Sequence, residues 1–285
     1  MSNYISPSGY NVLPPVVKNL LIINGLLFLA KMILPSSLHI NLDEILGLHF
    51  WGSQLFYPFQ FITYMFMHGD FSHILFNMFA LWMFGSTLEN YWGAKRFLIF
   101  YFFTGIGAAL VHYTVFYFQI QPTLHLIDGY LTNPDFEWFK AYINSPKFLA
   151  YPEIVDYYNS VFVPAANSAG SDAGVVQASV DFMTYYRNAY LDLHKVVGAS
   201  GAIYGLLLAF GMTFPNSLIY IYFLFPIKAK WFVIAFGAIE LFSGIRNNPT
   251  DNVAHFAHLG GMLFGIILIL LWKRKDINRH FQNYS

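Results

Sequence analysis

The chain has 285 residues, of which 56% are hydrophobic and only 11% are charged, and its formal net charge at pH 7 is zero. Soluble domains carry about 25% charged residues, so lipid must surround much of this protein. The neutral balance argues against a nucleic-acid partner, and the absence of cysteine excludes disulfide bonds, thiol catalysis and metal binding by cysteine.

Several apolar runs are long enough to cross a bilayer, whose hydrocarbon core needs about 20 residues of helix. Six such runs cover residues 16–35, 71–91, 95–118, 197–214, 229–245 and 253–272. We therefore expect an all-α membrane protein with a bundle of six transmembrane helices. Asp70 is the expected N-cap of the second helix, and Pro215 ends the short fourth helix.

The segment 36–69, between the first and second runs, is rich in aromatic residues. Pro58, Gln60 and Gly69 interrupt any continuous helix there. We expect a loop with short helices that lie partly in the membrane interface. A seventh span is the alternative, and it would place the two termini on opposite sides of the membrane.

A long segment, 119–195, separates the third and fourth runs. It contains an aromatic stretch from Asp135 and a run of small residues at 165–174, and it ends in an expected helix at 175–194. A disordered segment would not carry so many aromatic residues. We expect a partly helical insertion that is a lid over the candidate site or a surface that recruits substrates.

The domain organisation follows from these segments. Residues 1–118 and 196–275 form the expected membrane core, 119–195 the insertion and 276–285 a tail. Lys and Arg residues of short loops favour the cytoplasmic side, which here is the side of both termini. We therefore expect cytoplasmic termini, an outer insertion and a location in a bacterial inner membrane. Lys31 can extend from its helix end to the bilayer surface.

Ser200 opens the fourth run and is a candidate nucleophile. A serine needs a base to take its proton, and histidine is the commonest base. His258 lies 58 residues later, and both residues fall roughly 5–8 Å below the outer ends of their helices. His255, one turn earlier, is the alternative base. Gly198 and Gly201 beside the serine permit a tight turn and the close approach of a substrate.

Four groups could stabilise an oxyanion formed next to Ser200. His73 and Asn77 are four residues apart and share one face of the second helix. The backbone N–H groups of Ala199 and Ser200 lie at a helix N-terminus, where the helix offers them no acceptor. Fixed donors of this kind stabilise tetrahedral intermediates.

Each of these residues also has a structural interpretation. A serine between glycines in a membrane helix usually serves packing, and a histidine there is often a hydrogen-bond partner. Gly261 and Gly265 indicate close helix packing, which would bring the fourth and sixth helices together. We interpret Glu89 and Glu240 as structural residues.

Taken together, these residues resemble the rhomboid family of intramembrane serine proteases. Three motifs carry the resemblance in the family's order: His73-x-x-x-Asn77, Gly198-x-Ser200-Gly201 and Ala257-His258-x-x-Gly261-x-x-x-Gly265. Tyr204 matches the tyrosine against which the family's catalytic histidine packs, and Glu89 matches a buried acid that is frequent in the family. The resemblance covers residues 16–118 and 196–272.

The resemblance implies a rhomboid-like six-helix fold and a Ser–His dyad without an aspartate. It also implies a transmembrane protein as substrate, a mobile fifth helix at the point of substrate access, and no metal or organic cofactor. Two features depart from the family pattern. Phe59-Gln60 stands where many members have Trp-Arg, and the segment 119–195 is longer than the family core needs.

An intramembrane serine endopeptidase is therefore the first functional interpretation. The alternative is a non-catalytic rhomboid-like protein that binds and routes membrane proteins, although Ser200 and His258 are both present. A transporter or channel is a third class. It would require paired charges or broken helices near the middle of the membrane, and the central parts of the six runs contain almost none.

Overall fold

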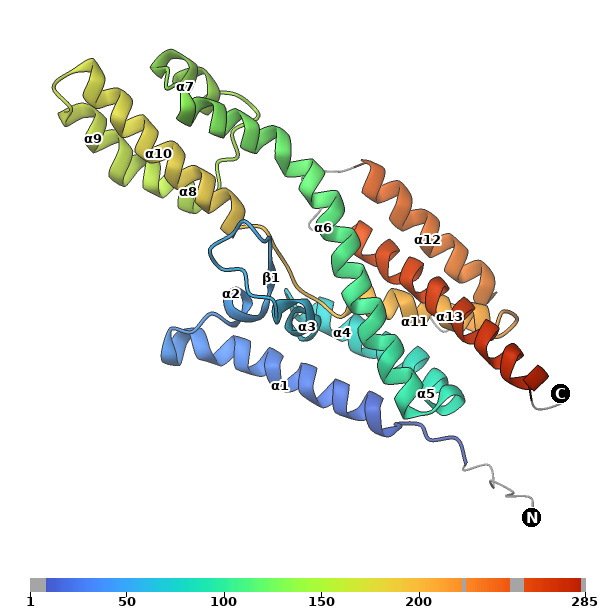
Figure 1. The fold of residues 1–285 in the computed structure, drawn as a ribbon. Helices are drawn as coiled ribbons and strands as arrows, with labels where there is room; N and C mark the ends of the chain where they lie inside the picture. The colour runs from blue at the N-terminus through green and yellow to red at the C-terminus, as the bar shows by residue number, and fades with distance from the viewer. Residues whose placement is uncertain (1–8, 222–223, 247–253, 283–285) are drawn as a thin grey trace. The chain divides into compact units, whose positions relative to one another are not determined.

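The computed structural model describes residues 9–221, 224–246 and 254–282, with side chains as far as residue 274 (Figure 1). The chain is mostly helical and divides into two compact units. The first unit comprises residues 1–48, 58–113 and 196–285. The second unit comprises residues 49–57 and 114–195. Each unit has its own core and is described separately.

Each of the six predicted apolar runs contains a helix, although the fourth run is helical only from Ser200 to Thr213 and residue 253 of the sixth lies outside the described residues. They correspond to α1 (Pro15–Leu38), the continuous segment α4–η2–α5 (Phe71–Ala80, Leu81–Gly85, Ser86–Trp92), α6 (Ala94–Thr132), α11 (Ser200–Thr213), α12 (Ala229–Arg246) and α13 (His255–Gln282). Four helical stretches are long and apolar enough to cross a membrane, namely Pro15–Leu38, Phe71–Trp92, Ala94–Thr132 and His255–Arg274. Helix α11 is a shorter apolar helix.

The segment between α1 and α4 contains only short helices, as expected. They are α2 (Leu42–Leu46), α3 (Gln60–Thr63) and η1 (Tyr64–Phe66), and β1 is a two-residue strand (Leu48–His49). The side chain of Gln60 is buried and donates to the carbonyl of Ile45 at 3.1 Å. The hydroxyl of Thr63 donates to the carbonyl of Leu46 at 2.8 Å. These bonds anchor a loop that lacks the Trp-Arg pair.

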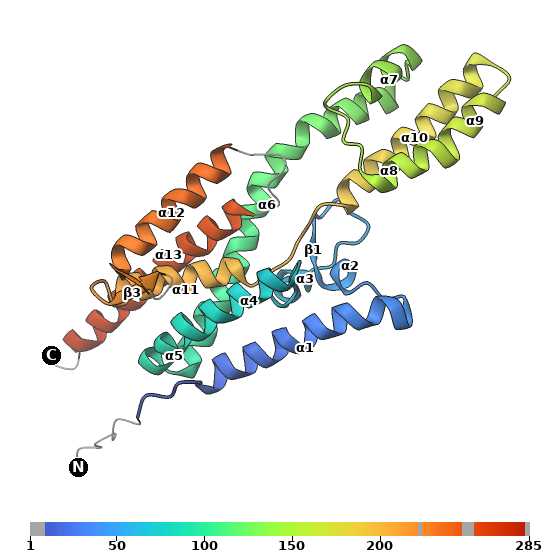
Figure 2. The same ribbon diagram turned by 180° about the vertical axis from the view of Figure 1, so that it is seen from behind.

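Helices α11, α12 and α13 lie side by side in the first unit (Figure 2). The closest approach joins Gly261 of α13 to Gly201 of α11, because a Cβ atom at Gly261 would overlap the carbonyl oxygen of Gly201. Gly265, one turn further along α13, faces Leu208 of α11 and Phe100 of α6. The glycines therefore let the backbones of α11 and α13 touch, which sets the distance between their N-terminal ends.

Glu89 has a structural role in α5, near the C-terminal end of the second predicted span. Its carboxylate is buried and accepts hydrogen bonds from the backbone N–H groups of Val16 and Val17, at 3.0 and 2.8 Å. These N–H groups belong to the first turn of α1, which has no intrahelical acceptor for them. A carboxylate is also favoured at a helix N-terminus by the helix dipole.

The chain between α11 and α12 forms a short antiparallel hairpin that the all-α prediction did not include. Strand β3 (Leu218–Ile221) pairs with β4 (Phe225–Lys228), with Leu218 opposite Lys228. Helix α13 continues as far as Gln282, so most of the predicted tail is helical; residues 283–285 lie outside the described residues.

The second unit is built around an aromatic core. Helix α6 continues to Thr132, whereas the sequence predicted an end near residue 118. The remaining elements are α7 (Phe136–Ile143), α8 (Pro152–Tyr157), η3 (Tyr158–Phe162), α9 (Val163–Ser168), α10 (Asp172–Asp192) and the short strand β2 (Lys195–Val196). The core residues are Ile127, Tyr130, Phe139, Tyr142, Ile154, Phe162, Phe182, Met183 and Tyr186. Ser53 donates to Asp192 at 2.6 Å and ties residues 49–57 to α10.

Candidate active site

Ser200 and His258 meet at the N-terminal ends of α11 and α13. Ser200 is the first residue of α11, and His258 lies in the first turn of α13. The Nε2 atom of His258 is 2.9 Å from the Oγ atom of Ser200, and His258 is buried. A histidine at this distance can accept the serine proton. His255, the alternative base, directs its Nδ1 atom toward Glu240 instead, at 2.6 Å.

Gly198 shapes the backbone in front of Ser200. Its φ angle is +129°, which favours glycine over residues with a side chain. A Cβ atom here would lie 2.8 Å from the Cε1 and Nε2 atoms of His73 and 3.6 Å from Oγ of Ser200. The N–H group of Gly198 donates to the carbonyl of Tyr64 at 2.9 Å. Because residue 198 has no side chain, the imidazole of His73 can lie next to Ser200.

His73 presents a hydrogen-bond donor to this region. Asp70 caps α4 by accepting from the N–H group of His73 at 2.8 Å, as the sequence predicted. The N–H group of Gly69 donates to Nδ1 of His73 at 3.3 Å. An imidazole that accepts at Nδ1 carries its proton on Nε2, and Nε2 is the nitrogen that lies against Gly198. His73 can therefore donate toward an oxyanion formed next to Ser200.

Asn77 lies one turn further along α4. Its side chain is buried, and its Nδ2 group has no hydrogen-bond partner in the part of the chain that the structure describes. A buried donor without a partner costs about 1–3 kcal/mol, which favours a ligand that supplies an acceptor. The second predicted oxyanion donor is thus available for such a contact.

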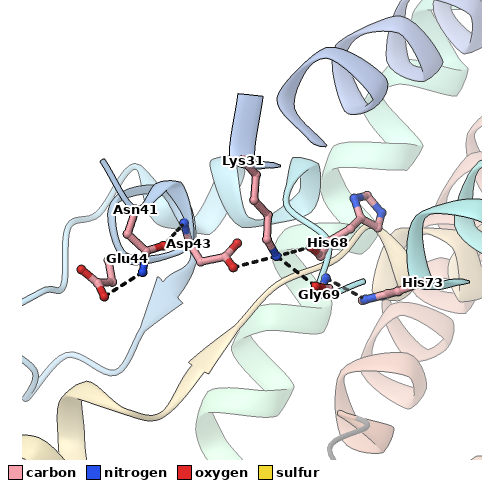
Figure 3. Close-up of polar contacts among 7 residues, drawn as sticks. All are labelled: Lys31, Asn41, Asp43, Glu44, His68, Gly69 and His73. Atoms are coloured by element: carbon pink, nitrogen blue, oxygen red, sulfur yellow. Dashed lines mark hydrogen bonds and ion pairs between the residues drawn. The ribbon is translucent and has the colours of Figure 1, made fainter. Parts of the chain in front are cut away.

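Lys31 anchors the turn that positions His73 (Figure 3). Its ammonium group is 2.7 Å from a carboxylate oxygen of Asp43. The same group donates to the backbone carbonyls of His68 and Gly69, at 2.5 and 3.1 Å. We predicted only that Lys31 extends to the bilayer surface. That expectation stays a prediction, and the contacts show that Lys31 ties α1 and α2 to Gly69, whose N–H group bonds His73.

Replacing Lys31 by methionine keeps the length of the side chain but removes these contacts. We expect the free energy of unfolding to fall by about 1–3 kcal/mol, because Asp43 loses its partner. We also expect kcat for the proposed cleavage to fall about tenfold, since a small displacement of a positioned group is costly. Lys140→Met is the control, because Lys140 and Glu137 form an exposed ion pair worth at most about 1 kcal/mol. Equal effects of the two substitutions would contradict the anchoring role.

His68 is a second histidine in this turn, and it is buried against His73 with 5.1 Å between the ring centroids. Burial is the main reason, and the charge of His73 a further one, why the pKa of His68 is lowered to about 3. The unfolded chain binds a proton at His68 below about pH 6.5, whereas the folded protein binds it only near pH 3. The folded state therefore loses stability as the pH falls from about 6.5 toward about 3.

The substitution His68→Asn tests this linkage. The parent should lose up to about 1.4 kcal/mol for each pH unit below 6.5 on account of His68. The variant should lose less over the same interval, because asparagine binds no proton. Thermal unfolding in detergent at about pH 7.5 and about pH 5 measures the difference. The packing lost by the variant is the same at both pH values and cancels. Identical pH dependence in both proteins would contradict the assignment.

The side chain of Glu240, on α12, lies beside the Nδ1 atom of His258. The hydroxyl of Tyr204 donates to Oε1 of Glu240. The Nδ1 atoms of His255 and His258 lie 2.6 and 2.9 Å from Oε2 of Glu240. The ring of Tyr204 stacks on that of His258, with 4.1 Å between centroids and 7° between planes. The sequence placed Tyr204 against His258 through the family resemblance, but it gave no partner for Glu240.

A comparison with protein families shows the family to which this chain belongs. A family model described as the rhomboid domain matches residues 56–119 and 166–275, which is more than half of the chain. The protein belongs to the rhomboid family. Its helices and its family together make it an integral membrane protein.

Two curated proteins are similar in sequence to parts of this rhomboid protein. An uncharacterized mitochondrial rhomboid protein of Schizosaccharomyces pombe is 24% identical over 223 residues, which is 76% of this chain and 52% of the relative. A chloroplastic protein of Arabidopsis thaliana, rhomboid-like protein 11, is 39% identical over 57 residues, or 20% of each chain. The chain thus spans about half of the first relative and a fifth of the second. The expected bacterial location stays a prediction.

A metal ion could bind this rhomboid protein at only one group of histidine and acidic side chains within the described residues. Glu240, His255 and His258 offer ligand atoms that lie within 4.8 Å of one another. All three side chains take part in the contacts around Glu240, and these contacts account for the cluster. The prediction that no metal is needed stays a prediction.

Proposed function

We propose that the protein is an intramembrane serine endopeptidase that hydrolyses a peptide bond in or beside the transmembrane segment of a membrane-protein substrate. The observation that carries the proposal is the contact of 2.9 Å between Ser200 and His258, two side chains from separate helices. Membership of the rhomboid family supports it. A non-catalytic role in binding and routing membrane proteins would require neither this contact nor a donor beside it.

In the proposed reaction, Oγ of Ser200 attacks the carbonyl carbon of the scissile bond while its proton passes to Nε2 of His258. The oxyanion accepts hydrogen bonds from Nε2 of His73, Nδ2 of Asn77 and the backbone N–H groups of residues 199 and 200. His258 then protonates the leaving amine, and the C–N bond breaks. A water molecule, deprotonated by His258, hydrolyses the acyl-enzyme and restores Ser200.

We further propose that α11 and α12 join the four longer helical stretches as a core of six transmembrane helices. The active site then opens to the outer face, with both termini in the cytoplasm. The distribution of Lys and Arg in the short loops supports this orientation. Residues 119–195 would form the insertion between the third and fourth spans on the outer side of the membrane.

The first test is cleavage of a model transmembrane substrate by purified protein in detergent. We expect the parent to cleave it and to react with a fluorophosphonate at Ser200. The variant Ser200→Ala should do neither while keeping the melting temperature of the parent, because only an oxygen atom is removed. A folded parent that neither cleaves nor reacts would contradict the proposal and favour the non-catalytic role.

A further inference from the structure

Glu240 carries a buried carboxylate on which three side chains from two neighbouring helices converge. Oε1 accepts from the hydroxyl of Tyr204 on α11. Oε2 lies within ion-pair distance of His255 and His258 on α13. Burying an ionised carboxylate is costly unless it is hydrogen-bonded. A convergence of this kind in the middle of an apolar helix indicates a role beyond helix packing.

The protonation of His258 explains what the carboxylate can do. Nε2 must be without a proton if it is to accept one from Ser200, so the proton of the neutral imidazole has to be on Nδ1. Nδ1 of His258 is buried, and within the described residues it forms no aligned hydrogen bond. Oε2 of Glu240 is the acceptor that lies near it, at 2.9 Å.

Tyr204 links the two groups. Its ring stacks on the imidazole of His258, and its hydroxyl donates to Glu240. The stack restricts the plane of the imidazole, and the hydrogen bond restricts the carboxylate. Of the other titratable groups, His255 shares Oε2, and His73 interacts electrostatically with His258 from α4. Glu240 is the one anionic group among these residues.

We infer that Glu240 is a positioning residue, which holds the proton of His258 on Nδ1 and so presents Nε2 to Ser200. This inference rests on the proposed function, and it adds a carboxylate to the Ser–His dyad that the family resemblance implies. When His258 takes the serine proton, the Nδ1 proton stays on the imidazole and the carboxylate stabilises the positive charge. The interpretation of Glu240 as a purely structural residue is thereby replaced.

The test combines kinetics with the NMR spectrum of protein labelled with ¹⁵N at histidine, in detergent micelles. We expect the parent to carry the His258 proton on Nδ1, with the resonances assigned by their loss in His258→Ala. In Glu240→Gln the amide can donate to Nδ1, so the proton should move to Nε2. We expect kcat to fall about 10²- to 10⁴-fold with little change in KM. Glu240→Asp, which keeps the charge, should recover part of the loss.

Glu89→Gln is the matched control, because the Glu89 side chain is also buried but bonds the start of α1. It should lower the melting temperature and leave both the His258 tautomer and the kcat of the folded protein unchanged. A parent spectrum with the proton on Nε2 would overturn the inference. So would a folded Glu240→Gln variant with the kcat of the parent.

Failure of the proposed function would be distinguishable from failure of this inference. A parent that does not cleave contradicts the protease assignment, but its spectrum still reports which nitrogen of His258 carries the proton. If Glu240→Gln does not fold, the parent spectrum and the Glu240→Asp variant decide the question.

Discussion

Replacing His258 by alanine is expected to lower kcat for substrate cleavage by about 10⁴- to 10⁶-fold. The serine would then lack the group that takes its proton, since Nε2 of His258 is the nitrogen at 2.9 Å from Oγ. The leaving amine would also lack its proton donor. Reaction of Ser200 with a fluorophosphonate should be lost as well, because that reaction needs the same base. Single-turnover cleavage in detergent measures the first effect, and labelling measures the second.

His255→Ala is the control for this substitution. His255 lies one turn away on the same helix and bonds Glu240 through Nδ1, whereas the hydrogen bond to Ser200 comes from His258. We expect His255→Ala to lose at most about tenfold in kcat, through the changed surroundings of Glu240. If His255→Ala abolished cleavage and His258→Ala retained it, the assignment of the base would be wrong.

The second large effect is expected for Gly261→Ala, although it adds one methyl group. Its Cβ atom would overlap the backbone carbonyl of Gly201, which cannot move without shifting α11. Overpacking of this kind costs about 1–3 kcal/mol or more. Separation of α11 from α13 would also carry Ser200 away from His258. We therefore expect a lower melting temperature together with a fall in kcat of at least about 10²-fold.

Gly237→Ala is the matched substitution on α12. A Cβ atom there would meet the flexible side chain of Met262 at 3.6 Å, which is an ordinary contact. It should change the melting temperature little, and helix propensity favours alanine. A Gly261→Ala protein with the stability and kcat of the parent would show that the two helices can separate without consequence, contrary to the packing described here.

The elements of the membrane core could be predicted because each one is a local property of the sequence. Apolar runs of sufficient length identify spans, and Asp70 identifies the start of α4. The continuation of α6 to Thr132 could not be predicted in this way. The polar residues Gln119 and Gln121 and then Pro122 interrupt the apolar run, but the helix continues where aromatic residues of the second unit pack against it.

The candidate site was partly predictable for a similar reason. Ser200, His258, His73 and Asn77 stand at spacings that fix their depth and face, and the structure brings Ser200, His258 and His73 close together. The partners of Lys31 and Glu240 depend on contacts between distant parts of the chain. A single charge in an apolar helix indicates a function, but it does not say which side chain the charge meets.

Helix α12 has one further consequence for the chemistry. Its buried residues are few, namely Ala229, Val233, Glu240 and Gly244, and its other faces are largely exposed, including Phe242 and Ile245. The carboxylate near His258 is therefore carried by a helix that packs on α11 and α13 through a narrow stripe of buried residues. The contacts of Glu240 with Tyr204, His255 and His258 then serve both the proposed catalysis and the packing of α12. A displacement of α12 would move Glu240 away from His258 and so lower the reactivity of Ser200, although α12 does not carry the serine. By linkage, the protonation state of His258 would in turn change the preferred position of α12.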